Sequence, residues 1–420
     1  MKKIIKFENG LRLAIQTVKS TKAVAIGILV GTGSAYENAE NNGISHFTEH
    51  MLFKGTAKRT AFQIADEPEG IGAQINAATG REYTLYYTIS LSEHFKQCAD
   101  ILSDMLFNST FLPVNIDKER GVIIEEINGC SDDPSDLVGD LSQEAYYGKQ
   151  GLGRTILGPI DNIKKFTQED FFNYQKERYT ADNTVISVAG CINEKEAIEI
   201  VRSLFADKFT NLELTASKTY KSDIQKRYIE SIKTISQANA EFMFPAFKSL
   251  SKQSKIASII GHCLGGGMSS RLFQEIREEL GLAYEVYCSQ MSCTHEGSMT
   301  VSFATDPKNI VKATKAMRKI LDEACANGLT DEEIQKTKEQ LKSATVLGTE
   351  SASSLMRSNG MRVLRENRLF DVRRAVKEID SIKPDDVNKL IKKIFVFSKV
   401  SCGYVGGKYG KKNLLEVLGD

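Results

Sequence analysis

The chain has 420 residues, too long for one ordinary core and suited to two domains of about 200 residues each. Hydrophobic residues make up 41% and charged residues 26%, the composition of a folded globular protein. The 55 basic and 54 acidic side chains leave a net charge of +1, which argues against a nucleic-acid-binding surface.

No stretch approaches the ~18 apolar residues of a membrane span, and the N-terminus lacks the apolar core of a signal peptide. We therefore expect a cytoplasmic protein with no membrane partner; an organellar protein that has lost its presequence is the alternative. The eight cysteines form no Cys-x-x-Cys pair and are expected to be reduced and buried. Cys288, Cys293 and His295 lack the spacing of a zinc module, so buried strand cysteines are the preferred interpretation.

Short β-branched segments alternate with longer helical patterns along the chain. Residues 23–30 and 184–190 have the composition of buried strands. Helical spacing with early acidic residues predicts four helices, over residues 94–107, 117–128, 168–178 and 193–206.

Two local features have a more specific meaning. Residues 73–78 and 83–88 flank the turn signal Thr79-Gly80 and predict a β-hairpin. Residues 60–69 have helical spacing, but Pro68 is expected to end or kink that helix because proline lacks the amide donor.

The two halves of the chain show a weak internal repeat. The polar, aperiodic stretch 207–226 is interpreted as a linker between an N-terminal domain, 1–206, and a C-terminal domain, 227–420. At an offset of 216 residues, three pairs of similar segments coincide: 25–31 with 241–247, 166–170 with 382–386, and 185–190 with 401–406. Three coincidences at one offset predict a duplicated α+β unit.

Two of the five histidines, His46 and His50, stand four residues apart. On a helix their imidazoles share one face, which is the spacing needed to bind one zinc ion. Glu49 lies beside His50, where it could take a proton from water at the metal. The alternative is a helix with two surface histidines, but His-x-x-Glu-His rarely occurs by chance in a chain with so few histidines. The motif therefore predicts a catalytic zinc.

A catalytic zinc usually has three protein ligands, and no third histidine has a suitable context. We therefore expect a carboxylate from the helical segment 115–129. Glu119 and Glu126 are seven residues apart and share a face, whereas Glu125 points about 100° away from Glu126. Each of these glutamates could also belong to a solvated helix face, so spacing alone leaves the third ligand open.

The motif His46-x-x-Glu49-His50, followed by Glu126, resembles the inverted-motif zinc metallopeptidases of the pitrilysin/insulinase family. The chain is most similar to the short members of that family, such as the β subunit of mitochondrial processing peptidase and its bacterial relatives. The resemblance extends along the chain through Asn9–Leu11, Gly31–Glu37, His50–Thr56, Asn76–Thr79, Glu82–Thr84 and Gly265–Phe273.

This resemblance implies an α+β fold of two homologous domains, each a mixed, largely antiparallel sheet covered by helices, facing each other across a cavity. It implies one zinc ion per chain, held by His46, His50 and Glu126. Glu49 would be the general base, and Glu119 a carboxylate that orients a ligand and supports catalysis.

In the family, an arginine and a tyrosine spaced like Arg277 and Tyr284 reach the substrate, and the tyrosine helps to hold the oxyanion. By its residues alone, Arg277 could instead be an exposed helix arginine paired with Glu275 or Glu279. At the offset of 216, Glu49 and His50 align with the glycines of 265–267, so the second half should lack such a site. That glycine triplet is either a plain turn or a loop that approaches another backbone closely.

We therefore expect a zinc-dependent endopeptidase acting on peptides or unfolded segments. The family resemblance implies that substrate pairs with the hairpin's strand edge at Asn76 and Ala77; a plain core hairpin is the alternative. It also implies a homodimer or a two-chain assembly with a related subunit. The competing interpretations are a non-catalytic subunit of the same fold and a peptide-binding scaffold with a structural zinc.

Overall fold

The computed structural model describes residues 2–210, 213–408 and 411–419. They fold into two compact units, each built around one β-sheet. Unit 1 comprises Met1–Ile127, Thr155–Tyr220 and Val346–Val372, and unit 2 comprises Asn128–Arg154, Lys221–Thr345 and Arg373–Asp420.

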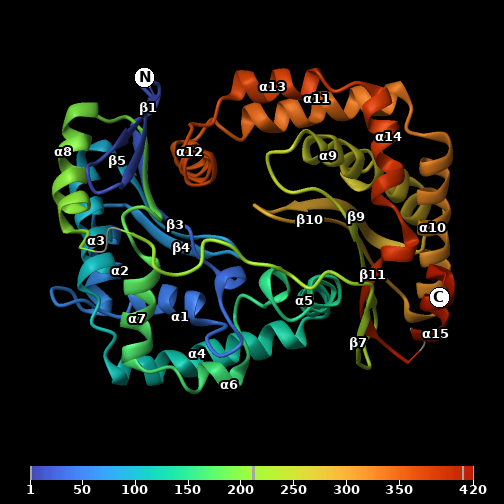
Figure 1. Cartoon of the computed structure of the whole chain (residues 1–420), viewed down its shortest axis with the longest axis horizontal. Helices are drawn as coiled ribbons and strands as arrows, with labels where there is room; N and C mark the ends of the chain where they lie inside the picture. Colours follow the sequence, from blue (N-terminus) through green and yellow to red (C-terminus); the bar gives the residue numbers. More distant parts are fainter. Residues whose placement is uncertain (1, 211–212, 409–410, 420) are drawn as a thin grey trace. The chain divides into compact units, whose positions relative to one another are not determined.

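Unit 1 contains a six-stranded sheet in the order β1-β2-β6-β3-β5-β4 (Figure 1). The β2–β6 pair is parallel and the other neighbours are antiparallel. Strand β4 is therefore an edge strand, paired on one side only. The bounds are β1 Lys2–Lys6, β2 Arg12–Thr17, β3 Ala23–Val30, β4 Gln74–Thr79, β5 Thr84–Leu91 and β6 Thr184–Gly190.

Both faces of this sheet are buried under helices. Val24, Ile26 and Ile28 of β3 join the core beneath α3, while the alternate residues Ala25 and Leu29 join the core beneath α12. Figure 1 shows α3 and α8 on one side of the sheet and α12 on the other. The helices are α1 Ile44–Leu52, α2 Ala61–Gly70, α3 Phe95–Asn108, α6 Ile160–Ile163, α7 Gln168–Arg178, α8 Glu194–Leu204 and α12 Ala352–Glu366.

Unit 2 contains a five-stranded sheet in the order β7-β11-β8-β10-β9. The strands are β7 Tyr228–Ile232, β8 Ala238–Pro245, β9 Ala283–Ser292, β10 Gly297–Thr305 and β11 Ser401–Gly406. The helices are α5 Pro134–Tyr147, α9 Lys252–Gly265, α10 Ile310–Asn327, α13 Val372–Asp380, α14 Pro384–Ile394 and α15 Lys411–Leu418. Two further helices, α4 Pro113–Asp132 and α11 Asp331–Leu347, each contain a point where the chain passes from one unit to the other.

The predicted duplication is confirmed strand by strand. The order β2-β6-β3-β5-β4 in unit 1 matches β7-β11-β8-β10-β9 in unit 2, and each has one parallel pair followed by antiparallel pairs. Helices α7 and α14 also correspond at the offset of 216 residues. The fold prediction of two similar α+β sheets covered by helices is correct.

The compact units are not the contiguous halves 1–206 and 227–420. Helix α12 comes from the second half but covers β2, β3 and β6 of unit 1, and α5 comes from the first half but covers β8 and β11 of unit 2. Glycines allow both helices to approach closely: a Cβ on Gly27 would lie 2.4 Å from Met356 Sδ, and one on Gly403 would lie 2.5 Å from the Ser142 amide. The halves have therefore exchanged one helix each.

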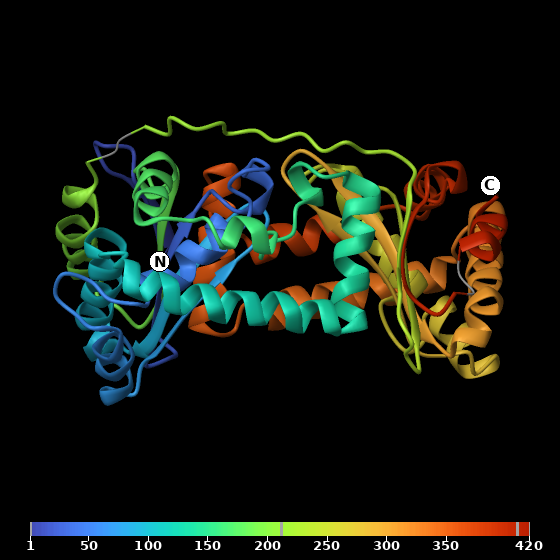
Figure 2. The ribbon, with the colours of Figure 1, turned by 90° about the horizontal axis from the view of Figure 1, so that it is seen from below.

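The predicted linker contains no helix or strand over residues 213–226, and Figure 2 shows this yellow-green segment as an extended trace. Residues 211 and 212 lie outside the described part of the chain. The part of the linker up to Tyr220 belongs to unit 1: the Tyr220 hydroxyl donates to Glu82 Oε1 at 2.8 Å, and its ring meets Tyr36 edge-on. Lys218 also pairs with Asp182 at 2.7 Å.

Local predictions were largely correct. The strands at 23–30 and 184–190, the helix at 168–178 and the hairpin β4–β5 all form. Pro68 does not end its helix, because α2 continues to Gly70. The Pro68 carbonyl still accepts hydrogen bonds from the Ile71 and Ala73 amides, so the backbone turn continues past the proline.

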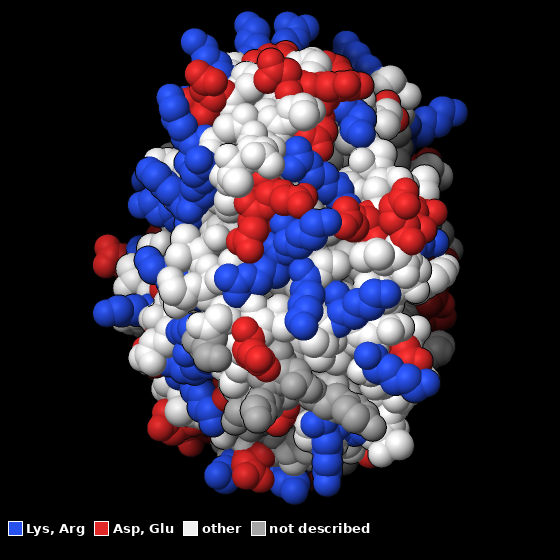
Figure 3. Space-filling model, turned by 90° about the vertical axis from the view of Figure 1, so that its right-hand side faces the viewer, with Lys and Arg blue, Asp and Glu red and all other residues white. Residues whose placement is uncertain are grey.

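The cysteines are reduced, and five of the eight are buried; Cys130, Cys191 and Cys325 are only half-buried. None of the helices in the described residues is long and apolar enough to cross a bilayer. Figure 3 shows the face of unit 2 that carries α10, α14 and α15, where basic and acidic side chains are interspersed. This distribution agrees with the balanced composition of the chain.

Candidate active site

The two histidines of the motif lie on α1, a helix of nine residues in unit 1. Phe47 and Met51 anchor one face of α1 in the core. His46 and His50 project together, as the i, i+4 spacing predicts, with ring centroids 4.5 Å apart. Helix formation on an apolar stripe thus places both imidazoles side by side.

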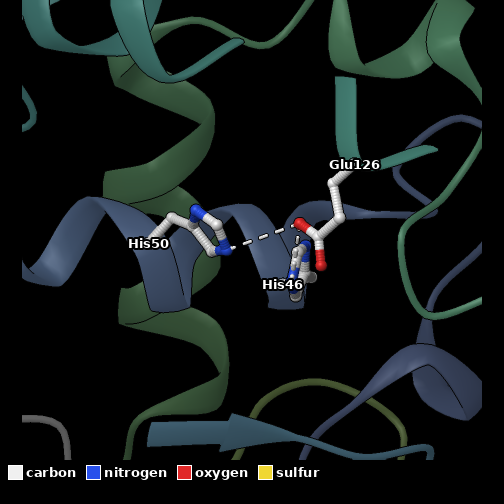
Figure 4. Close-up of side chains that lie close together, drawn as sticks. All are labelled: His46, His50 and Glu126. Carbon is white, nitrogen blue, oxygen red and sulfur yellow. Dashed lines mark ion pairs between the residues drawn. The ribbon is translucent and has the colours of Figure 1, made fainter. Parts of the chain in front are cut away.

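Glu126 of α4 completes a group of three (Figure 4). Its Oε2 atom lies 3.7 Å from His46 Nε2 and 3.8 Å from His50 Nε2. The three candidate ligand atoms all lie within 4.8 Å of one another. The structure therefore brings together the three residues that the family resemblance indicated as ligands.

This donor set fits zinc. Two imidazoles and one carboxylate are the ligands of many catalytic zinc sites, where bonds of about 2.0–2.2 Å put ligand atoms about 3.4 Å apart. The observed separations are close to that value. Within the described residues, no other group of His, Cys, Asp and Glu has such an arrangement, and the sequence neighbours Cys288, Cys293 and His295 do not form one.

His50 is held by a second carboxylate. Its Nδ1 donates to Glu119 Oε1 at 2.8 Å, which leaves Nε2 with a free lone pair directed at Glu126. Lys54 Nζ binds the other oxygen of Glu119 at 2.8 Å. Burial alone would raise the pKa of Glu119, but the hydrogen bonds from His50 and Lys54 outweigh it and keep that pKa below its ordinary value. Glu119 is therefore ionised and orients the imidazole.

His46 is held differently. It is 8% exposed, and burial, together with the neighbouring His50, lowers its pKa to about 3. It is therefore neutral at pH 7, as a metal ligand must be. No group among the described residues hydrogen-bonds its Nδ1 atom. The backbone of α1 and the surrounding packing thus determine where this ring lies.

Glu49, beside His50 on α1, is bound by strand β4. The Thr79 hydroxyl donates to Glu49 Oε2. Burial raises the pKa of Glu49, and the bond from Thr79 opposes this rise. A half-buried carboxylate with a raised pKa next to a metal site is well suited to accept and release a proton.

Asn76 and Ala77 lie on β4, opposite Tyr87 and Tyr86 of β5. Because β4 is the edge of its sheet, its second side carries backbone groups that have no strand partner among the described residues. The strand ends at Thr79, so this edge leads to the hydroxyl that binds Glu49. The hairpin is thus part of the core on one side and an open edge on the other.

Arg277 and Tyr284 belong to unit 2. Arg277 lies in a π-helical turn, Phe273–Glu279, and its guanidinium stacks 4.7 Å from the centroids of both the Phe273 and Tyr284 rings. Its carboxylate neighbour is Glu278, at 3.4 Å, and not Glu275 or Glu279 as in the alternative interpretation. Tyr284 is the second residue of strand β9 and is 70% exposed.

Sequence reasoning missed the roles of Lys54 and Thr79. Lys54 follows His50 by four residues, a spacing that signals proximity on a helix, but its partner Glu119 is far along the chain. Thr79 is separated from Glu49 by 30 residues and reaches it only because the β4–β5 hairpin passes α1. No local pattern encodes either contact.

Two family models match the chain: Insulinase (Peptidase family M16) over residues 12–160 and Peptidase M16 inactive domain over residues 165–341. An uncharacterized zinc protease of Bacillus subtilis, YmxG, is 35% identical over 92% of this chain and 94% of its own length. An uncharacterized zinc protease of Streptomyces coelicolor is 32% identical over 92% of this chain and 85% of its own length.

Solved structures agree on the fold. A protease from Helicobacter pylori superposes with a TM-score of 0.91 at 19% identity, covering 97% of this chain and 99% of that one. The peptidase M16 inactive domain from Pseudomonas fluorescens gives 0.88 at 17% identity, with 97% and 98% covered.

Fold and site together define a metallopeptidase with a duplicated α+β architecture. The chain belongs to the insulinase family of peptidases, family M16. The family inferred from its motifs is therefore confirmed, and zinc is the metal that its relatives' names imply.

Proposed function

We propose that this protein is a zinc-dependent endopeptidase that cleaves peptides or unfolded, extended segments. The observation that carries the proposal is a half-buried carboxylate, Glu49, one residue from a candidate ligand and held by a hydroxyl from the edge strand. A base beside a histidine–histidine–carboxylate group has the parts that peptide hydrolysis needs.

His46, His50 and Glu126 would hold one zinc ion per chain. When bound, zinc would lower the pKa of the attacking water and polarise the scissile carbonyl. Glu119 keeps His50 in the tautomer that offers Nε2, and Lys54 keeps Glu119 ionised. His50 is thus supported by a chain of charged hydrogen bonds.

Glu49 would accept the proton of the attacking water and then deliver it to the leaving amine. The Thr79 hydroxyl holds one of its carboxylate oxygens, Oε2, which restricts the rotation of the side chain. The raised pKa of Glu49 favours the second half of this cycle, because the protonated acid must persist until the amine departs.

The open edge of β4 would bind the substrate. An extended peptide can add to this edge through main-chain hydrogen bonds at Asn76 and Ala77. Such an interaction recognises the backbone of the peptide more than its side chains. Such binding requires an unfolded segment and tolerates many sequences. We also propose that Arg277 and Tyr284 contact the substrate and that Tyr284 stabilises the oxyanion, as the family resemblance implies.

A non-catalytic subunit or a binding scaffold would use the same strand edge. It would have no need for a carboxylate poised as Glu49 is, so the Thr79–Glu49 bond favours the enzyme.

The test is digestion of an unbiased peptide mixture by the purified protein, analysed by mass spectrometry. We expect internal cleavages that stop when a chelator removes zinc and return when zinc is added back. The variant Glu49→Gln, prepared in the same way, is the control for a contaminating protease. Cleavage that persists without metal, or that persists unchanged in this variant, would refute the proposal.

A further inference from the structure

The ligand helix α1 starts at a residue that cannot cap it. Its N-cap position is Gly43, which has φ of +103° and no side chain to bind the free amides of the first turn. A Cβ there would lie 2.7 Å from the Leu157 carbonyl oxygen. The Ser, Thr, Asp or Asn that usually caps a helix is therefore excluded at this position.

Glu37, six residues earlier, supplies the missing cap. Its Oε2 accepts from the Asn42 side-chain amide at 2.7 Å and from the Gly43 amide at 2.8 Å. Its Oε1 accepts from the Ser45 amide at 2.8 Å and from the Ser45 hydroxyl. This carboxyl group is 7% exposed and lies at the N-terminal end of α1, where the helix dipole favours negative charge.

Further buried hydroxyls extend this cap into the core of unit 1. The Ser45 hydroxyl oxygen also lies 2.6 Å from the Tyr174 hydroxyl, which in turn lies 2.9 Å from the Thr32 hydroxyl. The segment that follows strand β3, helix α1 and helix α7 are thereby joined at the point where α1 begins. The first turn of α1 is fixed from outside the helix.

The two histidines depend on this turn unequally. His46 is the third residue of α1 and directly follows Ser45, and no described group binds its Nδ1. His50 lies in the last turn and is held by Glu119. A helix of nine residues is marginal by itself, so loss of its cap frays the first turn before the last.

We propose that Glu37 is a positioning residue for His46, and that it sets the affinity of the site for its metal ion by fixing the first turn of α1. The inference rests on the proposed zinc site. Glu37 would position His46 as Glu119 positions His50. Glu119 binds the imidazole directly, whereas Glu37 acts through the backbone of α1.

The test compares Glu37→Gln with the unchanged protein by zinc titration against a competing chelator. Glutamine keeps the shape of the side chain, but its amide nitrogen cannot accept a hydrogen bond. One of the two pairs of N–H and O–H donors that bind Glu37 would then face another donor. We expect the zinc dissociation constant to rise about tenfold or more, as for other supporting residues of metal sites. In saturating zinc, turnover should recover most of the loss.

The matched control is Asp104→Asn, at another buried carboxylate of unit 1, which binds Thr56, Arg59 and Asn108. It should lower the free energy of unfolding without changing zinc affinity. If Glu37→Gln binds zinc as tightly as Asp104→Asn does, Glu37 is only structural and the inference is overturned.

Two further measurements keep the outcomes separate. If Glu37→Gln fails to fold, Ser45→Ala removes one donor of the cap and should weaken zinc binding severalfold; unchanged affinity would overturn the inference. If the unchanged protein binds no zinc, the proposed function fails, whatever the variants show.

Discussion

The two units share one sheet topology, but among the described residues only unit 1 brings together a candidate metal site. At the offset of 216 residues, His46 corresponds to His262, which lies on α9 and pairs with Gln340 at 3.1 Å. Glu126 corresponds to Lys342 on α11, which pairs with Glu339 and Asp380. A cation thus stands where unit 1 has its carboxylate ligand.

The spacing between helix and edge strand differs as well. In unit 2, α9 lies so close to β9 that a Cβ on Gly265 would be 2.3 Å from the Cys288 amide nitrogen. In unit 1, the corresponding position holds Glu49, whose side chain has room to reach Thr79. The comparison teaches that one fold gains or loses a catalytic site through a few ligands and a small change in helix packing.

The largest effect should come from the residue that has no counterpart in unit 2. Glu49→Gln removes the proton acceptor and keeps all three candidate ligands. We expect kcat to fall about 10²–10⁴-fold with zinc content unchanged. Metal analysis measures the zinc content of the variant, and peptide kinetics measure its kcat. Wild-type turnover in the variant would remove Glu49 from the mechanism.

A substitution in unit 2 tests whether chemistry is confined to unit 1. Tyr284→Phe deletes one hydroxyl, so a role at the oxyanion predicts a fall in kcat of about 10²-fold with a modest change in KM. Tyr287→Phe, at another exposed position of β9, is the matched control and should be silent. Arg277→Ala should instead raise KM. Wild-type kinetics in all three variants, with zinc bound, would confine the site to unit 1.

The adjacent glutamates of α4 test the choice of the third ligand. Glu126→Gln should weaken zinc binding about 10–100-fold, because Oε2 of Glu126 faces both imidazoles. Glu125→Gln should leave affinity unchanged, since Glu125 is exposed on a different face of the helix. Zinc content after dialysis ranks the two variants, and the opposite ranking would move the ligand by one residue.

The smallest effect concerns the close packing of unit 2. Gly265→Ala places a methyl group against the backbone of β9, and overpacking of this kind costs about 1–3 kcal/mol of unfolding free energy. Zinc affinity should not change. Denaturant unfolding measures the loss, and an unchanged midpoint would show that α9 does not need to lie so close to β9.

Sequence alone predicted the parts of the site that obey a local period. The i, i+4 histidines and the seven-residue spacing of Glu119 and Glu126 required only helical geometry. It could not predict that α12 covers β3, because the contact of Gly27 with Met356 joins residues more than 300 positions apart. The bond from Thr79 to Glu49 was equally hidden, since it depends on how the hairpin lies against α1.

The exchange of α5 and α12 has a consequence for fragments of the chain. The backbone passes between the units five times, after Ile127, Arg154, Tyr220, Thr345 and Val372. Proteolysis at Lys221 would therefore not yield two self-sufficient domains. The N-terminal fragment would lack α12 and leave Ala25 and Leu29 of its sheet uncovered. The C-terminal fragment would lack α5. Each fragment needs a helix from the other, so a nicked protein should remain associated, and separately expressed fragments should be soluble only together.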